Sequence, residues 1–317
     1  MIEFRIRVAS KGELHEFPCD RNERILHAGL RGGIELPYEC ASGTCGTCKA
    51  TLVEGDTENA WDDAPARKYV KADKGEVLMC QSFPRSDCSL TVLKRVEPMA
   101  LGRSAPQRAR GHVRELRALA PGIVAFEVAL ERPMSFEAGQ FVLLEVPEIA
   151  GARSYSMVNF ARDARTLKFV VKRLPGGRVS EWLFGPRAGE RRVEIFGPLG
   201  HATFHPALAK HLICVAGGSG IAGMMSILEH AAEDEYFDRH DGRVFFGIRS
   251  NGDAFFLHEL AAFARRYERL RVTIVLSHEE PSPRVVADFP ELVFDNGLVH
   301  EAAKRAFGGP AAPDSLA

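Results

Sequence analysis

The sequence predicts a multidomain protein of mixed α+β and α/β class. Three observations support this. The N-terminal part combines strand patterns, one helix pattern and a loop with three closely spaced cysteines. The middle part is a series of short strand patterns separated by turn residues, and the last part alternates apolar strands with longer helices. A chain of 317 residues is long enough for two or three such domains.

Composition limits the classes of function. The chain is 45% hydrophobic and 26% charged with a net charge of -1, which is typical of a soluble globular protein. Nucleic acid or an anionic membrane would favour a basic excess, so we expect neither as a partner. No apolar run approaches the roughly 20 residues that span a bilayer. The first residues lack the continuous apolar core of a signal peptide. We therefore expect a cytoplasmic protein.

The N-terminal part has the elements of one compact unit that runs to about residue 97. Residues 2–8 alternate like a strand, and a second strand pattern, Glu13 to Phe17, follows a turn. Apolar residues from Ile25 to Leu30 have helical spacing, and two glycines follow them. A further strand is predicted at residues 47–55. We therefore assign residues 1–97 to a first domain.

Residues 98–109 are rich in proline, glycine, alanine and arginine without an apolar period, which predicts a linker. Beyond it, five strand patterns predict an antiparallel barrel or sandwich over residues 110–206. Their sequences are IVAFEVAL, FVLLEV, RSYSMVNF, TLKFVVKRL and RRVEIFG. In residues 207–317 the apolar strands HLICVAGG, RVFFGIRS and RVTIVLS alternate with helix patterns. This alternation predicts a parallel α/β sheet.

Three cysteines stand close together in the loop YECASGTCGTCKA. Cys40, Cys45 and Cys48 have the spacing C-x4-C-x2-C, and Cys80 follows at a distance. This is the spacing of plant-type [2Fe-2S] ligation. The small residues between the cysteines leave room for backbone N–H groups to approach the sulfurs and stabilise the cluster charge. We therefore predict these four cysteines as iron ligands.

Zinc is the alternative for this loop, although structural zinc sites usually bring their ligands in two separated pairs. Seven cysteines are too few and too unevenly placed for a secreted disulfide scaffold. Cys19, Cys88 and Cys214 show no partner pattern, so we interpret them as small buried hydrophobic residues or idle thiols.

With these ligands in place, residues 1–97 resemble a plant-type ferredoxin, and the resemblance implies a β-grasp fold. The middle segment is similar to the FAD-binding barrel of the ferredoxin-NADP reductase superfamily. Its residues Arg153, Ser154, Tyr155 and Ser156 match the family's R-x-Y-S signature. The resemblance implies that Tyr155 faces the isoalloxazine ring, that Arg153 holds the pyrophosphate and that Ser156 lies near flavin N5.

Further positions match the same family. Val171 and Lys172 lie where the family lines the cofactor, and GGRVSEWL matches its G-x-x-S element at a helix start. That element supplies Gly177, Val179 and Ser180, and the resemblance implies that it offers backbone donors to the FAD phosphates.

The last domain resembles the superfamily's nicotinamide-nucleotide module, which implies a Rossmann-like fold. The turn AGGSGIAG lies between a strand and a helix and matches the motif G-G-[ST]-G-I with Gly217, Gly218, Ser219, Gly220 and Ile221. It is not the G-x-G-x-x-G fingerprint. Gly223 stands where the family often has proline. Arg249 could pair with a 2′-phosphate, whereas Asp253 could favour an unphosphorylated ribose. The family resemblance favours NADH.

One departure concerns the C-terminal domain. The family normally continues with a strand that carries a C-G-P-P motif and lines the nicotinamide pocket, and this sequence contains no such motif. We expect either a shortened domain, with nucleotide binding the function most affected, or a pocket built differently.

Taken together, the chain resembles the reductase component of bacterial oxygenases, especially the toluene and phenol monooxygenase type. The resemblance implies electron transfer from NADH through FAD to a [2Fe-2S] cluster, and then to an oxygenase or an intermediate ferredoxin. It implies no catalytic acid or base. Two alternatives stay open. One is a reductase for a Rieske dioxygenase or a sugar-deoxygenating enzyme, and the other is a non-catalytic electron carrier.

Overall fold

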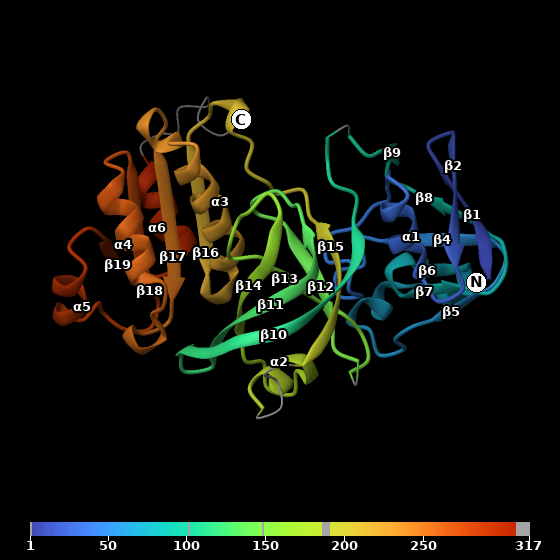
Figure 1. Cartoon of the computed structure of the whole chain (residues 1–317), viewed down its shortest axis with the longest axis horizontal. Helices are drawn as coiled ribbons and strands as arrows, with labels where there is room; N and C mark the ends of the chain where they lie inside the picture. Colours follow the sequence, from blue (N-terminus) through green and yellow to red (C-terminus); the bar gives the residue numbers. More distant parts are fainter. Residues whose placement is uncertain (1, 101, 148, 186–190, 309–317) are drawn as a thin grey trace.

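The computed structural model describes residues 2–100, 102–147, 149–185 and 191–308. Three units follow one another along the molecule, with a barrel between an N-terminal α+β unit and a C-terminal α/β unit (Figure 1). Among the described residues, no helix is both long and apolar enough to cross a bilayer. The predicted combination of α+β and α/β architecture is confirmed.

The N-terminal unit has a five-stranded sheet in the order β2-β1-β8-β4-β6. β1 runs antiparallel to β2 and parallel to β8, and helix α1 packs against β2. The strands and helix are β1 (Glu3–Ser10), β2 (Glu13–Asp20), α1 (Ile25–Arg31), β4 (Lys49–Glu54), β6 (Glu76–Leu78) and β8 (Cys88–Val92). The strand and helix patterns predicted in this part of the sequence are confirmed.

Short elements complete this unit. Two strand pairs lie outside the main sheet, and three 3-10 turns connect the strands around the cysteine loop. The pairs are β3 (Ile34–Glu35) with β9 (Glu97–Pro98) and β5 (Thr57–Asn59) with β7 (Ser82–Pro84). The turns are η1 (Pro65–Tyr69), η2 (Ala72–Lys74) and η3 (Met79–Gln81).

The central unit is a six-stranded antiparallel barrel sheet in the order β13-β12-β15-β10-β11-β14. Of the two architectures predicted for this part, the barrel is confirmed. Its elements are β10 (Gln107–Ala120), β11 (Ile123–Met134), β12 (Phe141–Glu145), β13 (Arg153–Ser156), β14 (Ala164–Lys172), α2 (Arg178–Leu183) and β15 (Arg192–Leu199).

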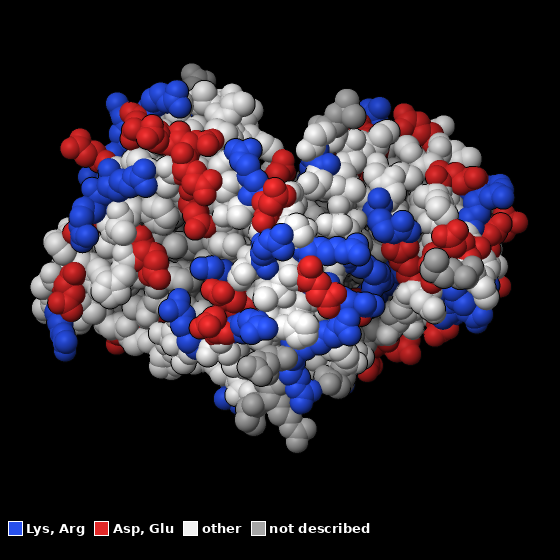
Figure 2. Space-filling view, in the orientation of Figure 1, with Lys and Arg blue, Asp and Glu red and all other residues white. Residues whose placement is uncertain are grey.

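Strand β10 corrects the sequence-based prediction, which had five strands here. Residues 107 to 109, predicted as the end of a linker, are paired with β15 at the start of β10. Only Val113 and Gly111 of this strand are buried, and several arginines alternate along it, so its apolar period is too weak to detect. In Figure 2, Lys and Arg side chains gather across the centre of the molecule, where Figure 1 shows β10 in the same orientation.

The C-terminal unit has a parallel sheet in the order β16-β17-β18-β19, as the alternating pattern predicted. Its elements are β16 (Leu212–Gly217), η5 (Gly218–Ile221), α3 (Ala222–Glu233), β17 (Gly242–Ile248), α4 (Leu257–Arg266), β18 (Leu270–Leu276), α5 (Pro283–Asp288), β19 (Val293–Asn296) and α6 (Val299–Phe307). Shorter 3-10 turns are η4 (Pro206–Leu208), η6 (Tyr236–Asp238) and η7 (Asn251–Asp253). Within the described residues, β16 is an edge strand.

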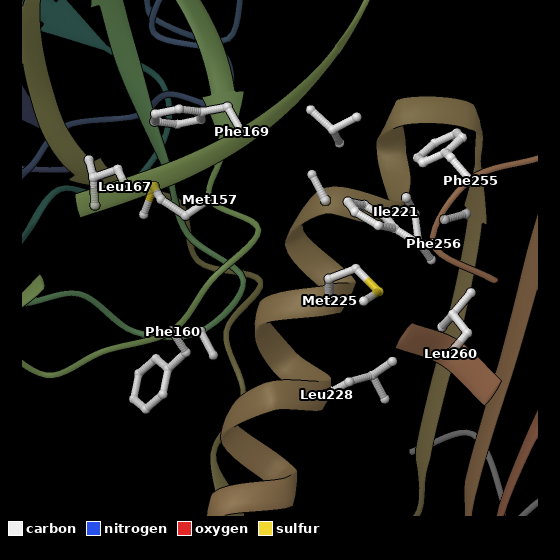
Figure 3. Packing of buried hydrophobic residues seen from close by; sticks show 14 of the residues in the cluster. Met157, Phe160, Leu167, Phe169, Ile221, Met225, Leu228, Phe255, Phe256 and Leu260 are labelled. Atoms are coloured by element: carbon white, nitrogen blue, oxygen red, sulfur yellow. The ribbon is translucent and has the colours of Figure 1, made fainter. Parts of the chain in front are cut away.

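Helix α3 joins the barrel to the α/β sheet. Figure 3 shows its apolar side chains between barrel residues on one side and the segment leading into α4 on the other. Phe160 of the barrel stacks on His230 of α3, with ring centroids 3.9 Å apart. The Ser226 hydroxyl accepts a hydrogen bond from Gly139 N–H at 2.8 Å. These contacts set the barrel and the sheet in one orientation.

The N-terminal unit also shares its core with the barrel. Leu143, Phe196 and Leu199 of the barrel belong to the same buried apolar cluster as the core of the N-terminal unit. Polar contacts surround this seam, since Arg24 pairs with Glu145 and Gly200 N–H donates to the Tyr38 hydroxyl at 3.0 Å. The cysteine loop is thereby held against the barrel.

Candidate functional site

The cysteine loop lies between α1 and β4 and bends sharply around its sulfurs. Cys40 Sγ accepts backbone N–H groups from Ser42 at 3.4 Å, Thr44 at 3.3 Å and Cys45 at 3.3 Å. Burial raises the pKa of the Cys40 thiol, but these hydrogen bonds outweigh it and lower that pKa to about 7. The loop therefore stabilises a thiolate, which is the form that binds iron.

The four predicted ligands come together as two pairs. Cys48 Sγ lies 3.0 Å from Cys80 Sγ, and the Cys40 and Cys45 thiols are close enough to interact. No group of three or more His, Cys, Asp or Glu in the described residues is arranged around a single metal ion. Two thiolates for each of two irons is the ligand arrangement of a [2Fe-2S] cluster. The donor set therefore fits that group.

Small residues make this geometry possible. Gly43 and Gly46 have φ angles of 86° and 83°, in the left-handed region that favours glycine. A Cβ added at Gly43 would approach Gln81 Nε2 to 3.0 Å, and that amide lies 3.8 Å from Cys80 Sγ. A larger side chain here would displace both the loop and a group next to a predicted ligand.

The cysteine loop contacts the R-x-Y-S strand directly. The Ser154 hydroxyl lies 2.6 Å from the Cys40 carbonyl, to which it donates, and 3.2 Å from Ser42 Oγ. Ser154 lies on β13 and is paired with Leu143 of β12, so its backbone position is defined by the barrel. The residue before it, Arg153, and the residue after it, Tyr155, line a cavity.

This first cavity, of about 360 Å³, brings together the residues predicted to bind FAD. It is lined by all nine of them: Arg153, Ser154, Tyr155, Ser156, Val171, Lys172, Gly177, Val179 and Ser180. Ser219 and Gly220 of the C-terminal unit line it as well, and Val170, Leu174 and Ala222 are lining residues that the motifs did not predict. Val170 alternates with Lys172 along β14, and Leu174 is close in sequence to the G-x-x-S element, so these two patterns could have indicated both residues.

Aromatic and cationic groups surround the mouth of this cavity. The Arg153 guanidinium lies 4.6 Å from the ring centroid of Trp61, which comes from the N-terminal unit. Burial lowers the pKa of Arg153 and raises the pKa of Tyr155 to about 12, so Tyr155 stays neutral. An apolar, aromatic wall beside a guanidinium suits a planar ring joined to a pyrophosphate.

Ser180 differs in detail from the expected role. Its hydroxyl lies 2.9 Å from Gly177 O and 3.1 Å from both the N and the O of Leu174. The side chain therefore braces the loop that enters α2, and its oxygen is already engaged within the chain. A Cβ added at Gly177 would meet Ser180 Oγ at 2.7 Å, so glycine is required for this brace.

A second cavity, of about 220 Å³, lies at the carboxyl ends of the parallel strands. Gly217, Gly218 and Arg249 line it as predicted, whereas Ile221 is fully buried in the core and lines neither cavity. Other lining residues are Gly247, Ile248, Phe255, Val275, Ser277, Gly297, Leu298 and Val299. Most of these residues lie at or just after the carboxyl end of a strand. Ligands of open α/β sheets bind at these ends, so the predicted strand ends could have indicated these lining residues.

Space for a nucleotide phosphate exists at the glycine turn. Cβ atoms added at Gly217, Gly218 or Gly220 would meet nothing within 4 Å, and Gly218 has φ of 51°. Gly223, where the family often has proline, approaches Ser156, so that an added Cβ would be 3.5 Å from the Ser156 Cβ. The start of α3 therefore lies directly against the first cavity.

Lys172 at the end of β14 lines both cavities. Within the second cavity, Arg249 Nε donates to Asp253 Oδ2 at 3.0 Å and Arg249 Nη2 donates to Oδ1 at 3.2 Å. Burial alone would raise the pKa of Asp253, but the Arg249 hydrogen bonds lower it below its ordinary value. The guanidinium is thus already neutralised by a carboxylate.

Comparison with family models covers most of the chain. Residues 8–85 match a 2Fe-2S iron-sulfur cluster binding domain, residues 111–204 an oxidoreductase FAD-binding domain and residues 214–289 an oxidoreductase NAD-binding domain. These matches follow the three units of the structure. They also agree with the cofactors predicted from the sequence, namely a [2Fe-2S] cluster, FAD and NADH.

Two relatives extend over nearly the same range. The ferredoxin-NAD(+) reductase component of the alkene monooxygenase system of Xanthobacter autotrophicus is 34% identical over 84% of this chain and 80% of the relative. The reductase component DmpP of phenol 2-monooxygenase from a Pseudomonas species is 30% identical over 97% of this chain and 84% of the relative.

Solved structures show the same architecture. The ferredoxin reductase in carbazole 1,9a-dioxygenase superposes with a TM-score of 0.79 at 26% identity, over 97% of this chain and 87% of that chain. The Amycolatopsis cytochrome P450 reductase GcoB superposes with a TM-score of 0.75 at 27% identity, over 95% and 86% of the two chains.

Proposed function

Since this chain belongs to the family of iron-sulfur flavoprotein reductase components of oxygenase systems, we propose that it delivers electrons from NADH to a partner oxygenase. The chain is an oxidoreductase with a [2Fe-2S], an FAD-binding and an NAD-binding domain. The acceptor we propose is the oxygenase itself or an intermediate ferredoxin. The relatives belong to an alkene monooxygenase system and a phenol 2-monooxygenase, and we propose an aromatic or alkene substrate for the partner oxygenase.

When bound, FAD and the [2Fe-2S] cluster would supply the conversion of a two-electron hydride donor into single electrons. The chain's own residues hold these groups in order. In our proposal, Gly217, Gly218, Ser219 and Gly220 bind the nucleotide phosphates, with Ser219 and Gly220 facing the first cavity and Arg249 beside the ribose. Arg153 holds the FAD pyrophosphate, Tyr155 covers the ring, and Ser156 lies beside the start of α3. No side chain needs to act as an acid or base.

One observation supports this proposal most directly: the nucleotide cavity adjoins the first cavity, and the first cavity adjoins the cysteine loop. The nucleotide cavity meets the first cavity at Lys172, and the first cavity meets the cysteine loop at Ser154. Each transfer then crosses one boundary between units, and each boundary is tightly packed. Fixed spacing of donor and acceptor is what an electron-transfer protein has to supply.

The domain boundaries, the ligand roles and the cellular location belong to the same proposal. We assign residues 1–97, 110–206 and 207–317 to the cluster, FAD and NAD domains, and the sequence given contains no C-G-P-P motif. All seven cysteines are free thiols in the structure, which suits the reducing cytoplasm. Cys40, Cys45, Cys48 and Cys80 are the proposed iron ligands.

The test is an anaerobic titration of the purified holoprotein with NADH, followed by absorbance and electron paramagnetic resonance. We expect the flavin absorbance to bleach and the reduced cluster signal to appear together. If the flavin stays oxidised, the protein is a carrier without NADH oxidation, and the proposal is wrong. If the flavin bleaches without the cluster signal, the transfer order is wrong.

A dioxygenase is the second candidate for the partner, because the ferredoxin reductase in carbazole 1,9a-dioxygenase aligns with almost the whole chain. Electron delivery by the purified reductase to a diiron monooxygenase and to a Rieske dioxygenase would separate the two partners.

A further inference from the structure

A group of cations surrounds the exposed side of the cysteine loop. The segment from Arg67 to Lys74 reads RKYVKADK, with four cations and a single anion in eight residues, whereas the whole chain has a net charge of -1. Arg67, Lys68, Tyr69, Lys71 and Lys74 are all exposed. The net charge of this segment therefore differs from the near-zero net charge of the whole chain.

This segment lies directly against the loop that carries the predicted ligands. Ala66 N–H donates to Gly43 O at 3.0 Å, and Lys49 Nζ lies 3.4 Å from Tyr69 O. A Cβ added at Gly46 would be 3.5 Å from Tyr69 Cδ2. Cys45, which is the exposed ligand of the four, therefore opens to solvent beside this segment.

The side chains of these cations form no ion pairs among the described residues, although the Glu76 carboxylate accepts the Lys71 backbone N–H at 2.8 Å and interacts with the Lys71 charge. No ion pair involves Arg67, Lys68, Lys71 or Lys74 within the part of the chain that the structure describes. Other exposed arginines of the N-terminal unit do form ion pairs, such as Arg7 with Glu16 and Arg31 with Glu23. Tyr69 is 54% exposed and Lys68 Nζ lies 5.0 Å from its ring centroid. Unpaired cations steer partners of opposite charge, and tyrosine is enriched in protein interfaces.

We propose that this surface, which we call the cationic rim (Arg67, Lys68, Tyr69, Lys71 and Lys74 around Cys45), docks the electron acceptor through an acidic patch on that acceptor. The proposal rests on the function proposed above and specifies its partner. Charge complementarity is the argument: the unpaired cations steer an acidic protein toward the loop side where a ligand reaches solvent. Tyr69 provides the apolar contact at the centre of the rim.

The test uses two defined probe proteins, the acidic cytochrome b5 and the basic cytochrome c. A triple variant, Lys68→Glu/Lys71→Glu/Lys74→Glu, reverses the sign of three charges of the cationic rim. The matched control, Arg271→Glu/Arg284→Glu/Lys304→Glu, changes the same net charge at exposed positions in the C-terminal unit. Dissociation constants between oxidised proteins are measured at low and high salt. Electron transfer is then measured after the protein is reduced with dithionite, which removes the dependence on NADH.

We expect the native protein to bind cytochrome b5 more tightly than cytochrome c, with affinity that falls as salt rises. Reversing the rim should weaken binding of cytochrome b5 and slow its reduction by at least about tenfold, and should favour cytochrome c. The control triple variant should behave like the native protein. Equal affinities for the two cytochromes, salt-independent binding, or equal losses in both triple variants would refute the proposal that the cationic rim docks the acceptor. A failed NADH titration with an intact rim effect would refute only the proposed function.

Discussion

Ser154 donates its hydroxyl hydrogen to the carbonyl of Cys40 across 2.6 Å, although 114 residues separate the two in sequence. Ser154 belongs to the strand that lines the first cavity, and Cys40 is a predicted iron ligand. A single side chain therefore connects the proposed flavin site to the proposed cluster site. In the proposed function, this contact lies at the boundary between the electron donor and the electron acceptor.

We expect Ser154→Ala to slow reduction of the cluster by the flavin about tenfold, because small displacements of reacting groups have large effects on rate. Stopped-flow absorbance after mixing with NADH would resolve the flavin and cluster phases. Reduction of the flavin itself should keep its native rate. Ser135→Ala, which removes an exposed hydroxyl bonded to Asp163, is the control. An unchanged cluster phase would show that this contact is not part of the route.

Replacing Cys45 by serine should separate the two halves of the reaction. Its thiol is the exposed member of the Cys40 and Cys45 pair, so its loss should remove the cluster while the barrel stays folded. NADH oxidation with ferricyanide should persist, and reduction of cytochrome c should fall to background. Cys88→Ala, at a buried cysteine outside the loop, should retain both activities. Equal loss of both activities in Cys45→Ser would contradict the proposed order.

Arg153→Ala should yield protein that is deficient in FAD. The guanidinium stacks on Trp61 and lines the first cavity, so its removal takes away both a pyrophosphate partner and a wall contact. The ratio of flavin absorbance to protein after gel filtration measures the effect. Arg153→Lys keeps the charge without the planar fork and should be intermediate. Normal flavin content in Arg153→Ala would refute the pyrophosphate assignment.

Asp253 should determine the preference for NADH over NADPH. Its carboxylate engages Arg249 through two hydrogen bonds, so the guanidinium is not free for a 2′-phosphate. We expect Asp253→Asn to raise kcat/KM for NADPH relative to NADH by about tenfold, since one charged contact is worth about that much. Asp253→Asn combined with Arg249→Ala should lose this gain. If the single variant leaves the ratio unchanged, Arg249 does not face the ribose.

His27 should contribute to the acid sensitivity of the fold. It is fully buried, stacks on Phe196 with ring centroids 4.1 Å apart, and has no well-formed hydrogen bond from either ring nitrogen among the described residues. Burial, assisted by Arg24 and Arg108, lowers its pKa well below 6.5. Below about pH 6.5 the unfolded chain therefore binds a proton that the folded chain does not, so stability is lost as the pH falls.

We expect His27→Phe to reduce this loss, because phenylalanine keeps the stack and cannot take up a proton. Urea unfolding at pH 7.5, 6.0 and 5.0 measures the free energy of unfolding for each protein. The exposed residue His300, changed to phenylalanine, should leave the native pH dependence unchanged. Parallel pH profiles for the native protein and His27→Phe would show that this histidine titrates normally.

Several features could be predicted because they depend on local pattern. The spacing of Cys40, Cys45 and Cys48 favours an iron-sulfur loop over a zinc site, since it matches the spacing of plant-type [2Fe-2S] ligands. Strands with a clear apolar period, such as β11 and β14, were identified for the same reason. Strand β10 was missed because its arginines face solvent and its pairing with β11 and β15 is non-local.

The sequence by itself determined the three kinds of unit and the cofactor chemistry of each, and it predicted the residues that bind the cofactors. Only the tertiary structure decided how the motifs meet: Ser154 against Cys40, Lys172 between two cavities, and Asp253 on Arg249. A motif reports the conformation of its own segment. Contacts between motifs depend on how separately folded surfaces pack, and that packing energy is spread over many residues.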